Sequence, residues 1–205
     1  MLRALVPVMV AAAMITAGGG EALAASASTS ELPKGFLLYE AKAAKPAKSW
    51  EKWEVSDSLG KRLELNPCAR DVGRDGRRAM RTITYSAETD YLSEQVVIYR
   101  STRAAGKALR AVRDELRRCA RGGSGHDRYS YKWKKTGIGD EALRVGGFFF
   151  ESRGRYLVVR RGSALAIYVR SGMVTKSLPS SQFRALEKDG RTMADKVCDL
   201  AHVCA

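Results

Sequence analysis

Histidine is scarce in this sequence, with only His126 and His202 among 205 residues. Imidazole is the usual general base near neutral pH and a common metal ligand. Two separate histidines therefore leave few catalytic options. We predict no catalytic residue, no metal site and no cofactor.

Long hydrophobic runs are absent after the first 24 residues. The most apolar later segments, residues 146–150 and 156–159, have the length of strands, whereas a membrane-spanning helix needs about 18 apolar residues or more. The sequence therefore predicts no membrane-spanning helix in the mature chain. No cysteine follows the small residues near position 24, so we also expect no bacterial lipid anchor.

The N-terminus has the features of an export signal. Arg3 supplies a positive charge, residues 4–17 are apolar, and Ala22-Leu23-Ala24 provides the small residues of a cleavage site. We predict a signal peptide at residues 1–24, cut after Ala24. The mature protein is then secreted to the extracellular side.

Four cysteines occur in the sequence, an even number: Cys68, Cys119, Cys198 and Cys204. Outside the cytoplasm cysteines usually oxidise, and four cysteines allow three pairings. Cys198 and Cys204 lie close together in the sequence, which favours a bond between them and a second bond between Cys68 and Cys119. The other two pairings stay open. In a helix, six residues rise about 9 Å, which exceeds the ~7 Å limit for disulfide Cα atoms. A bond between the last two therefore requires the final helix to unwind near residues 200–203.

Positive charge dominates the composition, with a formal net charge of +14. Such a field enriches polyanions at the protein surface. For an exported protein the available partners are anionic cell-wall polymers, acidic lipid surfaces and acidic proteins, and nucleic acid is not an expected partner. The alternative is that the charge only keeps the protein soluble. The oligomeric state cannot be deduced.

After the signal we predict an extended N-terminal segment or linker at residues 25–48 and one α+β domain at residues 49–205. The small-residue stretch 25–30 and the Ala/Lys tract 41–48 are typical of weakly ordered connections. Between them, apolar residues 32–38 can dock the segment onto the domain. Trp50 and Trp53 are expected to pack in the core.

Two hairpins are predicted from alternating or β-rich segments. Residues 79–85 and 92–99 form the first, after a loop at residues 70–78. Residues 156–160 and 164–169 form the second, with Gly162 in the tight turn. Two further alternating segments, residues 129–134 and 143–147, are typical of strands.

Two helices are predicted from apolar residues at intervals of three and four. The first begins after Ser101 as N-cap, and its apolar stripe ends at Cys119. The second begins at Pro179 and Ser180 and is bent or split at Gly190. Hairpins separated by helices favour an α+β fold, a mainly antiparallel sheet with two or more packed helices, stabilised by disulfides.

Two motifs that suggest chemistry are better explained by structure. Residues 137–142 match a loose dinucleotide-binding pattern but lack its strand and helix context, so they predict a turn with an acidic tip. Ser124, His126 and Asp127 suggest a catalytic triad, but they lie in a glycine-rich loop that supplies no preorganisation. We predict a mobile loop there and a surface position for His202.

Cations gather in two places, which we predict as anion-binding clusters. One is the outward side of the first helix; the other surrounds the second hairpin, where Arg153, Arg155 and Arg170 also contribute. A charged outward helix face is equally explained by solubility. The candidate residues are Arg103, Lys107, Arg110, Arg113, Arg117, Arg121, Arg160 and Arg161.

The helix that ends at Cys119, the turn at residues 137–142 and the hairpin around residues 158–162 follow one another in a familiar order. In these elements the chain resembles the extracytoplasmic sensor domain of actinobacterial PknH-like serine/threonine kinases, over residues 32–197. The resemblance implies an antiparallel sheet with helices, a cleft for an unidentified ligand, and a disulfide from the first helix to an upstream segment. Cys68 and Cys119 match that disulfide, whereas Cys198 and Cys204 depart from the family's second pair.

We therefore expect a secreted, non-catalytic, sensor-like domain that binds an unidentified extracellular ligand or anionic surface material. The sequence contains no kinase. The alternatives are an extracellular hydrolase that uses Asp or Glu carboxylates, and a secreted inhibitor or protein-binding protein. No ligand residues of the family can be transferred to this chain.

Overall fold

The apolar runs at residues 156–159 and 164–169 belong to a sheet that is covered on both faces. In the computed structural model, which describes residues 32–173 and 180–204, successive side chains of β8 point alternately into two separate hydrophobic clusters. Ala166 and Tyr168 enter one cluster, and Leu165 and Ile167 enter the other. A strand buried on both faces needs apolar side chains at every position, which explains why these runs do not alternate.

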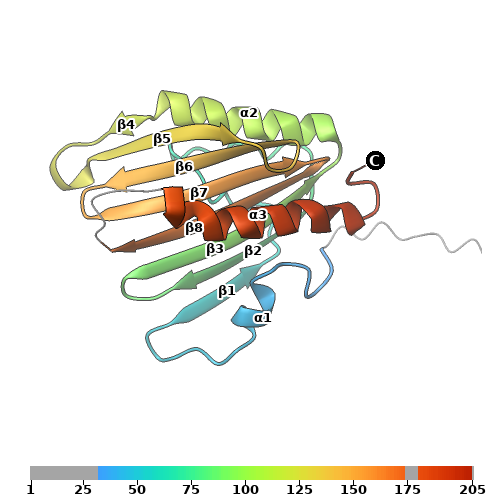
Figure 1. Cartoon of the computed structure of the whole chain (residues 1–205), viewed down its shortest axis with the longest axis horizontal. Helices are drawn as coiled ribbons and strands as arrows, with labels where there is room; N and C mark the ends of the chain where they lie inside the picture. Colours follow the sequence, from blue (N-terminus) through green and yellow to red (C-terminus); the bar gives the residue numbers. More distant parts are fainter. Residues whose placement is uncertain (1–31, 174–179, 205) are drawn as a thin grey trace, which may run out of the picture.

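The elements follow a simple order along the chain (Figure 1). The strands are β1 Lys52–Ser56, β2 Arg77–Ser86, β3 Asp90–Tyr99, β4 Arg121–Gly122, β5 Tyr129–Thr136, β6 Glu141–Phe149, β7 Ser152–Arg161 and β8 Ala164–Met173. The α-helices are α1 Glu40–Ala43, α2 Thr102–Arg118 and α3 Arg184–Lys196. The 3₁₀ helices are η1 Gly125–Asp127, η2 Ser180–Phe183 and η3 Val197–Asp199.

All eight strands form one antiparallel sheet in the order β1-β2-β3-β8-β7-β6-β5-β4. Both predicted hairpins are present, as β2–β3 and β7–β8, and Gly162 adopts φ +53° in the second turn. From β3 the chain crosses through α2 to the far edge and then returns strand by strand until β8 pairs with β3. The predicted α+β fold is confirmed.

Two layers cover the sheet. On one face lie α3 and the N-terminal residues 32–39, and on the other lie α2 and the loop that carries Leu63 and Leu65. Figure 1 shows α3 crossing β7 and β8. The first helix is confirmed, because the Ser101 side chain accepts a hydrogen bond from the Ala104 backbone N–H at 3.2 Å.

The N-terminal segment differs from the expected extended linker. Leu32, Phe36, Leu37 and Tyr39 are buried, so the predicted docking of residues 32–38 is confirmed, but it occurs through turns followed by α1. Two backbone N–H groups in this segment bind the buried Glu94 carboxylate, which fixes its path across the sheet. The signal peptide at residues 1–24 and the stretch 25–30 lie outside the described residues.

The prediction that both tryptophans pack in the core is wrong for Trp50, which is 63% exposed. Trp53 lies in β1 and packs against Tyr85, its partner across the strands, with ring centroids 4.8 Å apart. Trp50 precedes the edge strand and has no opposing layer, so its apolar ring stays in solvent.

Both disulfides have the favoured pairing. Cys68–Cys119 joins the loop before β2 to the end of α2, with Cα atoms 5.5 Å apart. Cys198–Cys204 has a Cα separation of 5.1 Å, which is possible because α3 ends at Lys196 and η3 turns the chain back. The helix therefore ends a few residues before the predicted position, and Pro179 lies outside the described residues.

The predicted bend or split at Gly190 is wrong, because α3 continues through it. A Cβ atom there would lie 2.5 Å from Leu157 Cδ2 and 3.1 Å from Val159 Cγ2, so glycine allows the helix to approach β7 closely. The residue serves packing between layers.

Replacement by alanine should have opposite effects on stability at the two glycines that lie within described helices, Gly190 and Gly106. We expect Gly190→Ala to lower the free energy of unfolding by about 1 kcal/mol, because overpacking of roughly 1–3 kcal/mol outweighs the helix-propensity gain of about 1. The matched Gly106→Ala in α2 should raise it by about 1 kcal/mol, since a Cβ there meets only Arg110 Nη1 at 3.4 Å. Urea unfolding measures both. A stabilised Gly190→Ala variant would contradict the close approach of α3 to β7.

Candidate functional site

Basic side chains gather on the part of the sheet face that α3 leaves uncovered. Antiparallel pairing of β5 to β8 brings alternate residues of these strands to the same side as α3. Six of them are cationic and form what we call the basic face: Lys132, Lys134, Arg144, Arg153, Arg155 and Arg170. Side chains of alternate strand residues share one face, so register alone assembles this cluster.

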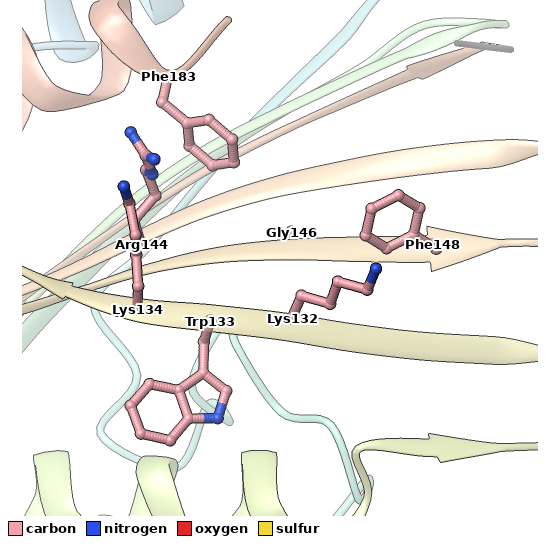
Figure 2. Close-up of a pocket in the computed structure, with 7 residues that line it drawn as sticks. All are labelled: Lys132, Trp133, Lys134, Arg144, Gly146, Phe148 and Phe183. Carbon is pink, nitrogen blue, oxygen red and sulfur yellow. The ribbon is translucent and has the colours of Figure 1, made fainter. Parts of the chain in front are cut away.

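A recess of about 220 Å³ opens on the basic face (Figure 2). It is lined by Lys132, Lys134, Arg144, Gly146, Phe148 and Phe183. Trp133 also borders it, but Figure 2 shows its ring on the opposite side of the sheet, toward α2. The recess therefore combines cations from two adjacent strands with aromatic rings from β6 and η2.

A second recess, of about 540 Å³, lies at the strand ends beside the first. Its walls are Arg121, Gly122, Gly123, Arg128, Tyr129, Ser130, Phe148, Phe149, Phe150 and Arg153. Phe148 borders both recesses. The Lys132 ammonium lies 5.5 Å from its ring centroid and the Arg153 guanidinium carbon 5.3 Å, within cation–π range, so the ring holds two cations beside it.

Arg144 is positioned by α3. Its guanidinium lies 3.2 Å from a Glu187 carboxylate oxygen and 4.9 Å from the Phe183 ring centroid. The side chain is only 15% exposed, so the cation is fixed rather than free to swing into solvent. Arg144 thus joins the helical layer to the wall of the first recess.

Arg155 and Arg170 are direct partners across β7 and β8. Like charges at opposing positions destabilise a strand pair. Burial is the main cause of the lowered pKa of Arg155, and the positive charge of Arg170 lowers it further. Two guanidinium groups are therefore held close together on the basic face at an electrostatic cost.

Negative charge is scarce around the two recesses. Among the residues that line them in the described chain there is no aspartate or glutamate. Glu187 reaches the first recess only through Arg144, and Glu151 and Asp90 lie at the ends of the neighbouring strands. The linings of the two recesses are therefore positively charged.

The cations predicted on the first helix lie on the other side of the sheet. Arg103, Lys107 and Arg110 are exposed there, whereas Arg113 forms an ion pair with Glu141 and its side chain is 14% exposed.

Two more members of this set also have local contacts. Arg117 lies 3.1 Å from Asp114 and 5.9 Å from the Trp133 ring centroid, and Lys107 lies 3.4 Å from Asp75. Arg121 lies beyond the helix in β4 and lines the second recess. The structure therefore separates Arg121 from the other five.

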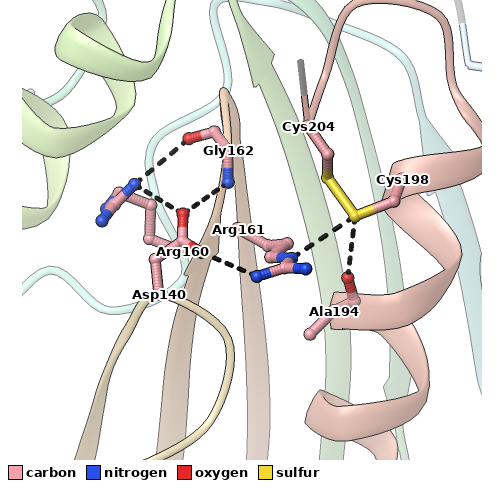
Figure 3. The surroundings of a disulfide bond; sticks show 7 residues. All are labelled: Asp140, Arg160, Arg161, Gly162, Ala194, Cys198 and Cys204. Atoms are coloured by element: carbon pink, nitrogen blue, oxygen red, sulfur yellow. Dashed lines mark hydrogen bonds and ion pairs between the residues drawn. A yellow bond between two sulfur atoms is a disulfide. The ribbon is translucent and has the colours of Figure 1, made fainter.

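Arg160 and Arg161 lie at the opposite end of β7 from the basic face. Their guanidinium groups contact Asp140 at 2.9 and 3.0 Å, and the Gly162 N–H donates to the same carboxylate at 2.8 Å (Figure 3). Burial opposes ionisation of Asp140, but this hydrogen bond and the two arginines outweigh it and lower its pKa. The predicted acidic turn is thus a structural clamp on the β7–β8 turn.

The residues of the imagined triad do not assemble. Ser124, His126 and Asp127 are exposed, and no hydrogen bond joins their side chains in the described part of the chain. The His126 ring packs edge-on against Phe150 at 4.4 Å between centroids. His202 is exposed, as predicted, with φ +63°.

Residues 32–173 and 180–204 contain no group of three or more His, Cys, Asp or Glu side chains that could hold a metal ion. None of the helices in these ranges combines the length and apolar character that a bilayer crossing requires. The predictions of no enzyme activity and no cofactor stay predictions.

Sequence reasoning missed Lys132, Lys134 and Arg144. The signal was present, because residues 129–134 alternate and their even positions carry the lysines. What the sequence lacks is the pairing that sets Lys134 against Arg144 and Lys132 against Gly146. Without that register, charges on separate strands cannot be assigned to one surface.

Comparison with known proteins gives a likeness of fold. No family model matches the chain, and no curated protein matches it. Among solved structures, the extracellular domain of PknH from Mycobacterium tuberculosis superposes with a TM-score of 0.54. The two chains are 12% identical, and the match covers 81% of this chain and 94% of that one.

The expected resemblance is thus confirmed at the level of fold. At this identity the likeness shows the fold alone and does not establish family membership. Two disulfides fit an oxidising, extracellular location.

Proposed function

We propose that this chain is a secreted, non-catalytic binding domain that recognises an anionic ligand with its basic face. The observation that carries the proposal is the gathering of six cations on one face of β5 to β8, where Lys132, Lys134, Arg144 and Arg153 line two recesses walled by phenylalanine. The structural neighbour is an extracellular domain of a different protein, which is compatible with a binding role outside the cell.

Cations beside apolar walls suit a ligand that carries negative charge on a partly apolar or ring-containing body. The charges attract the anion, and the aromatic rings of Phe148 and Phe183 contribute contact area. Screening by salt acts on exposed charges, so the affinity must fall as ionic strength rises. Anionic cell-wall polymers have this chemistry and are available to an exported protein.

Two triple variants of equal net charge test the location. Lys132, Lys134 and Arg170 are exposed on the basic face, whereas Arg103, Lys107 and Arg110 are exposed on α2. We expect K132Q/K134Q/R170Q to bind polyphosphate or poly-L-glutamate at least about tenfold more weakly than the wild type, at ~1 kcal/mol per cation near an anionic surface. The control R103Q/K107Q/R110Q should lose much less.

Titration at low and high salt measures both affinities, and thermal unfolding confirms that each variant is folded. If the α2 variant loses as much affinity as the strand variant, the basic face is not the site. If the wild type binds neither polymer at low salt, the proposed function is wrong.

A further inference from the structure

The second recess contains one row of residues that runs across four strands. Arg121 on β4 pairs with Ser130 on β5. Ser130 pairs in turn with Phe148 on β6, which pairs with Arg153 on β7. All four residues line the recess. Because residues paired across strands share one face of a sheet, the register places an arginine at each end of the row and an aromatic ring between them.

A further arginine, Arg128, lies close to Arg121 at one end of this row. The Arg128 backbone is extended, with φ −63° and ψ 129°, so it continues the alternation of β5 and shares a face with Ser130. Since Arg121 is opposite Ser130, the two arginines are diagonal neighbours, roughly 7–8 Å apart and within reach of long side chains. Both are exposed and both line the recess. Their guanidinium groups can therefore hold one anion between them.

The side chains of Arg121 and Arg128 have no partner within the part of the chain that the structure describes. No ion pair or hydrogen bond joins either guanidinium to another residue there. Asp127, which precedes Arg128, is exposed and supplies one negative charge nearby. Two cations and one carboxylate leave one uncompensated positive charge at this end of the recess, which a singly charged anion balances.

Arg153, at the other end of the row, is held in the wall. Its Nη1 donates hydrogen bonds of 2.6 and 2.8 Å to backbone oxygens at the β6–β7 turn, and its guanidinium carbon lies 5.3 Å from the Phe148 ring centroid. Two carboxylates lie on this side. Glu151 is in the same turn, and Asp90 Oδ1 lies 3.0 Å from where a Cβ of Gly172, the strand partner of Arg153, would stand. Positive charge at this end is therefore opposed within the protein.

Aromatic rings form much of the remaining wall. Tyr129, Phe148, Phe149 and Phe150 line the recess, and Phe150 is 42% exposed although its side chain is apolar. The volume of about 540 Å³ lies within the range of about 300–1,000 Å³ that small-molecule sites occupy. There is thus room for a ring-sized apolar body beside the anionic group, and its burial against Phe150 removes apolar surface from water.

We infer that the second recess binds a singly charged organic acid, with its carboxylate between Arg121 and Arg128 and its ring-sized apolar body against Phe148 and Phe150. This inference rests on the proposed function for an anionic ligand, but it specifies a small ligand and places its charge on two arginines outside the basic face. The planar guanidinium group matches a carboxylate in a bidentate manner. Both groups stay charged at about pH 7.5.

Three probes separate the contribution of the charge from that of the ring. At about pH 7.5, 2-naphthoate carries both, 2-naphthol is a neutral ring, and acetate is a carboxylate without a ring. We expect 2-naphthoate to bind at least about tenfold more tightly than either, and R121Q/R128Q to lower its affinity at least about tenfold through loss of charge-assisted hydrogen bonds. The matched control R103Q/R110Q, which removes two exposed arginines of α2, should leave the affinity unchanged.

A second pair of variants tests the aromatic wall. Phe150→Ser removes a ring that lines the recess, whereas Leu59→Ser removes an apolar side chain that lines neither recess, and both side chains are 42% exposed. We expect F150S to lower the affinity for 2-naphthoate about three- to tenfold, because a ring-to-ring contact is lost. L59S should bind as the wild type does.

Calorimetric titration gives the affinities, and thermal unfolding confirms that each variant is folded. The single variants R121Q and R128Q replace the double variant if it fails to fold. Binding of 2-naphthol or acetate as tight as that of 2-naphthoate, or wild-type affinity in R121Q/R128Q or F150S, would overturn the site. If K132Q/K134Q/R170Q still loses polymer binding in that case, the proposed function stands and only the small-ligand site is wrong.

Discussion

C68S/C119S should lose about 4 kcal/mol in free energy of unfolding, the largest change expected for any substitution considered. The disulfide joins residues 51 positions apart, and on the loop-entropy model a larger loop gives greater stabilisation. It holds the end of α2 against the loop that carries Leu63 and Leu65, so its removal also frees part of one hydrophobic layer.

C198S/C204S is the matched control, because it removes a disulfide that spans only 6 positions. The expected loss is about 2 kcal/mol. Urea unfolding of the oxidised proteins measures both. Equal losses, or a greater loss in C198S/C204S, would show that loop entropy does not govern the stabilisation.

Glu94→Ala should lower the free energy of unfolding by about 3 kcal/mol, since each buried donor left without a partner costs about 1–3 kcal/mol. The Glu94 carboxylate accepts hydrogen bonds from the backbone N–H groups of Leu38 and Tyr39, at 3.0 and 2.7 Å, and from the Tyr168 hydroxyl at 2.8 Å. Glu88→Ala, in the exposed β2–β3 turn, is the control and should stay within about 0.5 kcal/mol of the wild type.

The pH dependence of the free energy of unfolding provides a second test of Glu94. Burial raises the pKa of Glu94 above its ordinary value of 4.5, and the hydrogen bonds from Tyr168, Tyr39 and Leu38 only partly oppose this. The folded protein therefore holds the proton more tightly than the unfolded chain, so the contribution of Glu94 to stability falls as pH rises from 4.5 to its folded pKa. Relative to E94Q, the wild type should become less stable over that interval. An unchanged difference would contradict the raised pKa.

Local patterns in the sequence predicted the elements well because short-range chemistry determines them. The stripe that ends at Cys119 and the cap at Ser101 define α2, and glycine at position 162 suits the tight turn it occupies. The pairing of β3 with β8 is different, because Val96 and Ala166 are 70 positions apart and both strands are simply apolar. No local signal specifies that partnership.

The candidate site was predicted less well for a related reason. Clusters inferred from nearness in sequence placed Arg160 and Arg161 with Arg155, whereas β7 carries them toward opposite ends of the strand. The sequence did not indicate that Glu94 is buried, since a charged residue in a strand usually faces solvent. Its burial follows from the N-terminal segment, whose two backbone donors require an acceptor at that place.

Each of the two layers that cover the sheet contains one disulfide. Cys68–Cys119 fastens the side that contains α2, and Cys198–Cys204 fastens the side that contains α3, while the eight strands between them hold no cysteine. Loss of one disulfide is therefore expected to loosen the elements on one face of the sheet while the elements on the other face keep their own disulfide. Because Cys198–Cys204 lies beside Arg161, at the opposite end of β7 from the basic face, the shape of that face does not depend directly on this bond.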